Sequence, residues 1–551
     1  MSDEGSCDEA IGSDDRARRL DRIWIAVVVA VLAGRVLALA PAGGGLPIFS
    51  ANDRSRWATI RSLGDDGTYA IDALIAAPRN PWDTIDKVAH LGADGRMHYY
   101  SSKPTLLPTL LAFEYRLLRT LTGWTLDTYP DRVVRTMLLL SNVLPTGLLL
   151  WLTAGIARRR GASDATRGIL IAGLGLGTFV GTFVVTINNH LPAAIAVGIG
   201  VAALERTVRR RQIERDSASR GASVSDPRSF LVAAIGGAAC AFAASCELPA
   251  LSFAAVASLA FLVVDPRRTL LAFLPAMGLV ACAHFGTNWQ AHQSFRPAYA
   301  HRADGPIVAR LGTDETERIA RGSLSPSART ALAEAKIELS DLWSIEPGES
   351  PVPAGVRRWV LTDLRTQERW ALVEPKSGDE IEVRTWDNWY EYPGSYWTRP
   401  VERRSPVDRG EPSRWRYAWH MTLGHHGILS LTPIFALALW GGVLGLGRRN
   451  GWEWRAFVAG VATISLVCFL FYLSRPLIDR NYGGQTSVLR WMLWFAPLWM
   501  LLSLEAIERA MRSQYGRAAV LTLLIASIAS AAYSTSNPWV HPWAYTLFGG
   551  E

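Results

Sequence analysis

Long apolar runs recur along most of the chain and are separated by shorter polar segments. A helix needs about 20 mostly apolar residues to cross the hydrocarbon core of a bilayer. The apolar runs lie at residues 22–42, 133–156, 167–187, 190–206, 229–246, 249–264, 269–287, 427–446, 456–474, 489–504 and 517–535. They predict an all-α polytopic membrane protein with about eleven transmembrane helices.

Arginine clusters indicate how these helices alternate across the membrane. One cluster, Arg16–Arg19, precedes the first run. The others follow the second, fourth, sixth, eighth and tenth runs and are Arg158–Arg160, Arg209–Arg211, Arg267–Arg268, Arg448–Arg449 and Arg509–Arg517. Cytoplasmic loops carry an excess of Lys and Arg, so all six clusters are expected in the cytoplasm. The N-terminus is then cytoplasmic, and an odd number of spans places the C-terminus outside.

The first apolar run, Ile23–Ala40, follows a long polar leader, Met1–Asp21. A cleaved signal peptide has a shorter leader and a small-residue cleavage site. A retained first helix is therefore expected.

The segment Pro104–Trp124 is apolar enough for a further span, but counting it would place Arg158–Arg160 outside. We therefore predict a helix that lies in the outer interface, with Arg116 and Arg119 on its polar side.

Two large segments are expected outside the membrane, the loop 43–132 and the soluble domain 289–424. In the second, three short β-prone runs predict a small antiparallel sheet, namely Arg357–Thr362, Arg369–Glu374 and Ile381–Trp386. The stretch Ala303–Glu338 is expected to be helical or irregular. The resulting division is a cytoplasmic tail 1–21, a transmembrane module 22–288, a small α+β extracytoplasmic domain 289–424, helices 425–535 and an outer tail 536–551.

Composition agrees with a membrane location in the cell envelope. Of the 551 residues, 49% are hydrophobic and 19% charged, and 22 are tryptophan, a residue that collects at membrane interfaces. The five cysteines, Cys7, Cys240, Cys246, Cys282 and Cys468, have no metal-ligand spacing, so neither a disulfide framework nor a zinc site is expected. No nucleotide-binding loop and no nucleic-acid partner are predicted.

The first outer loop carries two motifs whose side chains are suited to catalysis. Asp53 follows the first membrane helix by a few residues, and Lys103 lies in Tyr99-Tyr100-Ser101-Ser102-Lys103-Pro104. A carboxylate can accept a proton from an incoming hydroxyl or amine. An ammonium can stabilise phosphate charge that develops as a bond breaks. Together they suit a reaction with an anionic substrate held in the membrane.

The run Asp53-x-x-Arg56-Trp57-Ala58-x-Ile60 resembles the first-loop motif of GT-C glycosyltransferases, above all the bacterial aminoarabinose transferases and the protein O-mannosyltransferases. Tyr100-Ser101-Ser102-Lys103-Pro104 is similar to their later aromatic–x–x–Lys–Pro motif. The resemblance extends roughly as far as His190.

The resemblance implies a GT-C-like fold and transfer of a sugar from a polyprenyl-phosphate donor to an extracytoplasmic lipid, glycan or protein. It implies that Asp53 acts as general base or holds the acceptor, and that Lys103, with Tyr100 beside it, contacts the donor phosphate. Arg56 would be a supporting charge partner. Membrane lipids would surround the enzyme in the cell membrane.

Two departures from the family pattern matter. The family often has Asp-Glu where this chain has Asp53-Arg54, and some relatives carry an acid where this chain has Asn189-His190. His190 is a candidate to replace that acid. The aspartate-rich metal motifs of oligosaccharyltransferases are missing, and Asp65-Asp66 is typical of a turn, so no metal or other cofactor is expected.

Further candidates lie at predicted outer ends of spans. Glu247 places a carboxylate beside a helix pair, and Arg480, Tyr482 and Arg490 flank Gly483-Gly484. Two arginines and a glycine turn suit a phosphate clamp. His425 and His426 are adjacent and therefore poorly placed to share one ion without help.

Structural roles compete with each assignment. Asp53 could be a helix N-cap, Lys103 could extend its ammonium to the interface, and Arg480 and Arg490 could anchor at headgroups. Two other functions also stay open, a transporter or flippase and a non-catalytic envelope assembly protein. A transporter commonly has related halves, whereas the glycine-rich run Gly173–Gly181 has no counterpart in a second half.

Overall fold

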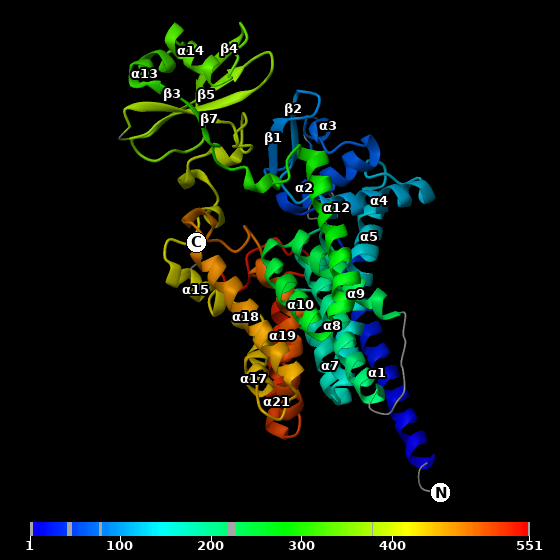
Figure 1. Cartoon of the computed structure of the whole chain (residues 1–551). Coiled ribbons are helices and arrows are strands. Elements are labelled where there is room, and N and C mark those ends of the chain that lie inside the picture. Colours follow the sequence, from blue (N-terminus) through cyan, green and yellow to red (C-terminus); the bar gives the residue numbers. More distant parts are fainter. Residues whose placement is uncertain (1–3, 41–46, 77–79, 219–227, 377, 549–551) are drawn as a thin grey trace. The chain divides into compact units, whose positions relative to one another are not determined.

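The computed structural model describes residues 4–40, 47–76, 80–218, 228–376 and 378–548 (Figure 1). Parts of the assigned tails and of the start of the first loop, at 1–3, 41–46 and 549–551, lie outside the described residues, as does the side chain of Cys7. The chain forms two units. Unit 1 comprises Met1–Ser50, Leu117–His284 and Pro406–Glu551, and unit 2 comprises Ala51–Arg116 and Phe285–Ser405.

Unit 1 is helical. Its main helices are α1 (Glu4–Leu37), α5 (Pro130–Leu138), α6 (Leu144–Arg159), α7 (Asp164–Ala172), α8 (His190–Ala218), α9 (Arg228–Cys246), α10 (Leu251–Val264), α11 (Pro266–Arg268), α12 (Leu274–His292, which continues into unit 2), α15 (Arg414–Thr422), α16 (Ile428–Leu431), α17 (Ala436–Gly445), α18 (Trp452–Ser474), α19 (Ala496–Leu502), α20 (Leu504–Ala510) and α21 (Gln514–Ala532) (Figure 1). A buried apolar cluster from α8, α9, α10, α18 and α19 forms its core.

Six helical segments of the described residues are long and apolar enough to cross a membrane. They are Pro130–Arg159, His190–Ser217, Arg228–Cys246, Pro266–His292, Trp452–Ser474 and Gln514–Ala532, and the bent pair Arg490–Leu502 and Leu504–Ala510 would make a seventh. The expected count of about eleven is therefore not confirmed. Helices do form at the other expected places, but α10 and α17 are short, with 14 and 10 residues.

The expected span 167–187 is not one continuous helix. α7 ends at Ala172, a π-helical turn covers Gly173–Gly177, and a 3-10 turn covers Phe183–Val185. Glycine weakens helices because it loses more backbone freedom on folding. It also permits close backbone contact here, since a Cβ on Gly181 would lie 2.0 Å from the carbonyl oxygen of Gly175. The side chain of Arg35 donates to the Gly181 carbonyl at 3.1 Å, which gives that arginine a structural partner.

Ion pairs connect three of the six predicted arginine clusters, Arg158–Arg160, Arg209–Arg211 and Arg267–Arg268, at one end of unit 1. Asp21, almost fully buried, accepts from Arg158 at 2.6 Å and from Arg167 at 2.7 Å. Four further pairs tie the same end together, namely Arg159–Glu205, Arg211–Asp265, Arg268–Glu214 and Arg160–Glu505. The C-terminal ends of α6, α8 and α10 therefore lie together with Asp21 of α1, in agreement with the predicted alternation for these three clusters. The side of the membrane on which this end lies stays a prediction.

Unit 2 contains two antiparallel sheets (Figure 1). A hairpin is formed by β1 (Lys87–Leu91) and β2 (Met97–Ser101). The second sheet has the order β3-β7-β6-β5-β4, with β3 (Ile307–Gly312), β4 (Trp343–Pro347), β5 (Arg357–Asp363), β6 (Arg369–Glu374) and β7 (Glu380–Thr385). The three expected strands are confirmed as β5, β6 and β7. The expectation of a helical or irregular stretch at 303–338 is wrong at β3, although α13 (Thr316–Ala320) and α14 (Pro326–Glu334) follow it.

The first outer loop and the beginning and end of the soluble segment pack together in unit 2. Val88 and Tyr100 of the hairpin share a buried cluster with Trp389 and Tyr390. The backbone N–H of Ala89 donates to the Trp389 carbonyl at 2.8 Å. The hairpin therefore shares a core with residues almost 300 positions later in the chain.

Three helices accompany the hairpin, α2 (Ala51–Arg61), α3 (Asp72–Ile75) and α4 (Leu106–Thr122). α4 forms where the interfacial helix was expected and is not among the described helices that qualify as spans. Leu107 and Leu111 are buried, whereas Leu110 and Phe113 are exposed on another face. Arg116 donates to the carbonyl of Leu63 at 2.6 Å.

Candidate functional site

Asp53 and Arg56 lie on α2 of unit 2, and both side chains are buried. α2 begins at Ala51, so Asp53 lies in its first turn rather than at its N-cap. Arg56 donates to the carbonyl of Asn52 at 2.8 Å and also contacts the Asn52 side chain. Burial of two ionisable groups is costly unless they are paired or hydrogen-bonded. The contacts with Asn52 hold the Arg56 guanidinium in place on α2.

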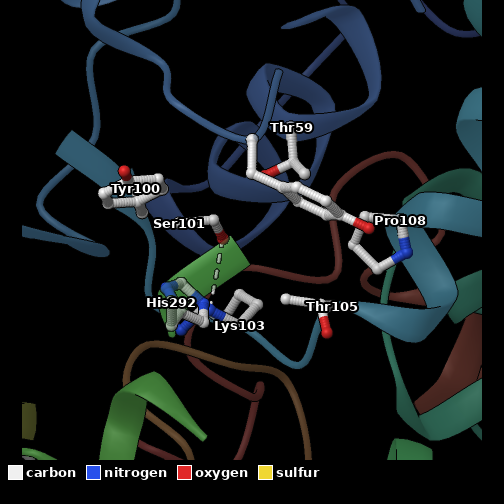
Figure 2. Close-up of a pocket in the computed structure, with 8 residues that line it drawn as sticks. Thr59, Tyr100, Ser101, Lys103, Thr105, Pro108 and His292 are labelled. Atoms are coloured by element: carbon white, nitrogen blue, oxygen red, sulfur yellow. Dashed lines mark hydrogen bonds between the residues drawn. The ribbon is translucent and has the colours of Figure 1, made fainter. Parts of the chain in front are cut away.

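Lys103 lies in a small pocket between β2 and α4. The pocket is lined by Thr59, Tyr69, Tyr100, Ser101, Lys103, Thr105, Pro108 and His292 (Figure 2). The Lys103 ammonium lies 2.8 Å from a carboxylate oxygen of Asp86, and both side chains are mostly buried. The pocket thus combines one cation with several hydroxyl groups.

α2 contributes directly to this pocket. Thr59 lines it, and the Ser55 hydroxyl lies 2.6 Å from the Ser101 hydroxyl. Ser55 also donates to the backbone carbonyl of Asp86, the residue that pairs with Lys103. The helix that carries Asp53 and Arg56 therefore reaches the Lys103 pocket through Thr59, whereas Asp53 and Arg56 are not among the residues that line it.

Tyr100 is part of an aromatic stack beside the pocket. Its ring stacks on His90 with centroids 4.3 Å apart, and His90 Nε2 lies 3.0 Å from His292 Nδ1. Burial lowers the pKa of His90 to about 4 and raises the pKa of Tyr100 to about 12. Both rings are therefore neutral near pH 7, and Lys103 supplies the positive charge of the pocket.

His190 and Glu247 meet in unit 1. His190 begins α8 and Glu247 follows the end of α9, so the antiparallel arrangement of the two helices brings them together. His190 Nδ1 lies 2.6 Å from a carboxylate oxygen of Glu247, and both side chains are at most 9% exposed. Asn189 is also buried, and its backbone carbonyl accepts from the N–H of Ala193 at 3.1 Å.

Arg490 reaches the same region through an aromatic neighbour. Its guanidinium lies over the Trp539 ring, 4.8 Å from the centroid. Phe183 contacts both Trp539 and His190, with ring centroids 5.6 and 6.2 Å away. A series of contacts through Trp539 and Phe183 therefore connects Arg490 to the pair of His190 and Glu247. Gly483, with φ of +102°, permits this arrangement, because a Cβ there would lie 2.3 Å from Arg490 Nε.

Arg480 and Tyr482 lie in a different group of contacts. The Arg480 guanidinium donates to the carbonyl of Pro412 at 3.0 Å, and the Arg480 carbonyl accepts from the N–H of Glu411 at 2.7 Å. The Tyr482 hydroxyl donates to Glu411 at 3.2 Å, and its ring stacks on His426 at 4.2 Å. These contacts join the loop before α19 to the segment that precedes α15.

One set of side chains in this group was not expected from the sequence. Glu411, His420 and His425 each offer an oxygen or ring nitrogen, and these atoms lie within 4.8 Å of one another. Burial lowers the pKa of His420 to about 4 and that of His425 to about 3, so both imidazoles are neutral near pH 7. The sequence drew attention to His425 with His426, whereas the structure places His425 against His420, five residues earlier.

No family model matches this chain, and no curated protein matches it. Among solved structures, the Archaeoglobus fulgidus oligosaccharyltransferase in the apo form matches 94% of this chain and 57% of its own, at 11% identity and a TM-score of 0.41. The Saccharomyces cerevisiae protein O-mannosyltransferase Pmt1–Pmt2 complex bound to the sugar donor matches 96% and 91%, at 12% identity and a TM-score of 0.41.

The archaeal oligosaccharyltransferase AglB of A. fulgidus, in complex with an inhibitory peptide and a dolichol-phosphate, matches 95% of this chain and 56% of its own, at 12% identity and a TM-score of 0.41. These three structures are thus two of an archaeal oligosaccharyltransferase and one of a protein O-mannosyltransferase complex. The chain spans little more than half the length of the archaeal enzymes.

Proposed function

We propose that this chain is a GT-C-type membrane glycosyltransferase that transfers a sugar from a polyprenyl-phosphate donor to an extracytoplasmic acceptor. The observation that carries the proposal is the pocket of Lys103, in which a mostly buried ammonium lies among hydroxyl groups beside α2. Thr59 of the pocket lies within the first GT-C-like motif, and Tyr100, Ser101 and Lys103 belong to the second.

The pocket suits a phosphate group attached to a lipid. An ammonium forms strong charge-assisted hydrogen bonds to phosphate oxygens. The hydroxyls of Thr59, Ser101 and Thr105 line the same pocket, and a phosphate would take over the hydrogen bonds that they now make within the protein. α4 begins three residues after Lys103 and exposes Leu110 and Phe113. An exposed apolar face beside a phosphate pocket favours a ligand whose hydrocarbon chain stays in the membrane.

In the proposed reaction Asp53 accepts the proton of an acceptor hydroxyl or amine. The acceptor atom attacks the anomeric carbon of the sugar, the bond between this carbon and the phosphate oxygen breaks, and polyprenyl phosphate leaves with the bonding electrons. Lys103 stabilises the charge that develops on this phosphate. Within unit 1, His190, paired with Glu247, is proposed as a further catalytic residue, and Arg490 as a residue that binds substrate.

The proposed face of the membrane follows from the arginines. His190 begins α8, and Arg209–Arg211 lie near its other end. The arginine end of unit 1 is cytoplasmic under the positive-inside rule. His190 and Glu247 are then extracytoplasmic. A sugar donor that is linked to a lipid rather than to a nucleotide suits this location.

The test uses the full chain in lipid nanodiscs and in sealed vesicles, with a panel of polyprenyl-phosphate sugars and nucleotide sugars. Release of free polyprenyl phosphate from a lipid-linked donor, and no turnover of nucleotide sugars, is the expected result. Movement of the intact donor across the vesicle membrane without cleavage would contradict the proposal and favour a flippase. Turnover of a nucleotide sugar alone would also contradict it.

A further inference from the structure

We propose that Glu411, His420 and His425 form a binding site for a divalent metal ion of the zinc type. The proposal does not depend on the glycosyl transfer proposed above. Two imidazole nitrogens and one carboxylate oxygen are a ligand set that proteins use for zinc, with a water molecule in the fourth position. The ligand atoms of these three residues lie within 4.8 Å of one another.

The hydrogen bonds of His426 determine which nitrogen His425 offers. His426 Nε2 lies 3.0 Å from the carbonyl oxygen of Thr486, which can only accept, so this nitrogen carries the proton. In a neutral ring the other nitrogen, Nδ1, must then accept, and it faces His425 Nδ1. His425 therefore donates from Nδ1, which leaves the lone pair on its Nε2 for a metal ion.

His420 Nδ1 can bind a metal ion if it gives up one weak hydrogen bond. Its Nδ1 accepts from the backbone N–H of His425 at 3.4 Å, a long and therefore weak hydrogen bond. Gly424 provides the space for this nitrogen, because a Cβ there would lie 2.3 Å from His420 Nδ1. The two imidazoles stack with centroids 3.8 Å apart, and both are almost fully buried.

Glu411 supplies the carboxylate. One oxygen accepts from the Tyr482 hydroxyl at 3.2 Å, and the other lies 3.3 Å from Arg416 Nε. Each carboxylate oxygen has two lone pairs, so these contacts leave capacity for a metal ion. An ion held by Glu411, His420 and His425 would tie the segment before α15 to the turn that follows α15.

The test measures metal binding by the purified full chain in detergent. After treatment with a chelator, the wild-type chain is titrated with Co²⁺, whose visible absorption reports tetrahedral coordination, and with Zn²⁺ in competition. We expect a single ion to bind, and the variants His420→Ala, His425→Ala and Glu411→Gln to lose the absorption band. His426→Ala retains the three ligands and is expected to weaken binding by about 10- to 100-fold, as the loss of a residue that orients a ligand does.

The matched control is His190→Gln, which alters another buried histidine beside a glutamate in unit 1 and should leave Co²⁺ binding unchanged. Gel filtration shows which variants remain folded, and the wild-type titration stands even if a variant does not fold. The proposal is overturned if the wild-type chain takes up no Co²⁺, or if folded His425→Ala and Glu411→Gln bind it as tightly as the wild type.

Discussion

Replacing Lys103 with methionine removes the ammonium and keeps a flexible side chain of similar length. The ammonium lies 2.8 Å from Asp86, in a side chain that is 16% exposed, so little water competes for it. A hydrogen bond to a charged group contributes about 1.5–3 kcal/mol. Since each 1.4 kcal/mol corresponds to a factor of ten, Lys103→Met is expected to lower kcat/KM for the lipid-linked donor by about 10- to 150-fold.

Lys103→Met also leaves the mostly buried Asp86 carboxylate without its cation. The resulting loss of stability must be separated from the loss of donor binding. The double variant Lys103→Met/Asp86→Asn neutralises both partners, so it should fold as well as the wild type yet show the same loss of kcat/KM. Lys87 offers a matched control, because it pairs with Asp83 in the same unit and its side chain is 14% exposed. Asp83 is 55% exposed, so Lys87→Met should change kcat/KM by no more than about twofold.

The assay measures release of polyprenyl phosphate in nanodiscs at donor concentrations well below KM, where the rate gives kcat/KM. Thermal unfolding of each variant shows whether it is folded. If the folded double variant turned over the donor as fast as the Lys87→Met control, the assignment of Lys103 to the donor phosphate would be refuted.

Three further predictions concern single features. His190→Ala removes the partner of the buried Glu247 carboxylate, which should cost about 3–5 kcal/mol; the Tm losses of His190→Ala and Glu247→Ala should not add in the double variant, and additive losses would contradict a direct pair. Gly483→Ala should cost about 1–3 kcal/mol, because φ is +102° and the new Cβ would meet Arg490; Gly484→Ala, with positive φ but open space, should cost less, and equal costs would be inconsistent with the contact. Burial raises the pKa of Glu114 from 4.5 to about 7, so the folded state retains a proton that the unfolded chain loses. Stability should therefore fall as pH rises from 4.5 to 7, and Glu114→Gln should remove this dependence in thermal unfolding measured across that range.

The sequence predicted those parts of the fold that depend on regular patterns. The alternation of arginine clusters indicated one common end, and the ion pairs of Asp21 and Glu205 tie Arg158, Arg159 and Arg167 there. The helix count was less predictable, because hydropathy alone does not show that glycines interrupt the helix after Ala172.

The missed strands have a physical explanation as well. β3 exposes most of its residues, so its apolar and polar positions do not alternate clearly, and β4 ends in a proline. β5, in contrast, alternates toward a buried core through Trp359 and Leu361. A strand that is recognised by alternation must have one buried face.

The candidate site was predictable where its residues are close in sequence. Asp53 and Arg56 lie one turn apart on α2, and Tyr100 and Lys103 belong to one motif. The pairing of His190 with Glu247 requires that α8 and α9 pack side by side, which no local pattern reveals. The approach of His420 to His425 likewise depends on the turn at Gly424.

The transfer activity of Asp53→Asn, compared with that of the wild type, tests the central proposal most directly. Asparagine keeps the shape of the buried side chain and removes the base, so the folded variant should bind the polyprenyl-phosphate sugar and fail to transfer the sugar to the acceptor. Asp83→Asn, which changes an exposed carboxylate of the same unit, is the control and should transfer normally. Transfer by folded Asp53→Asn at the wild-type rate would contradict the proposed mechanism.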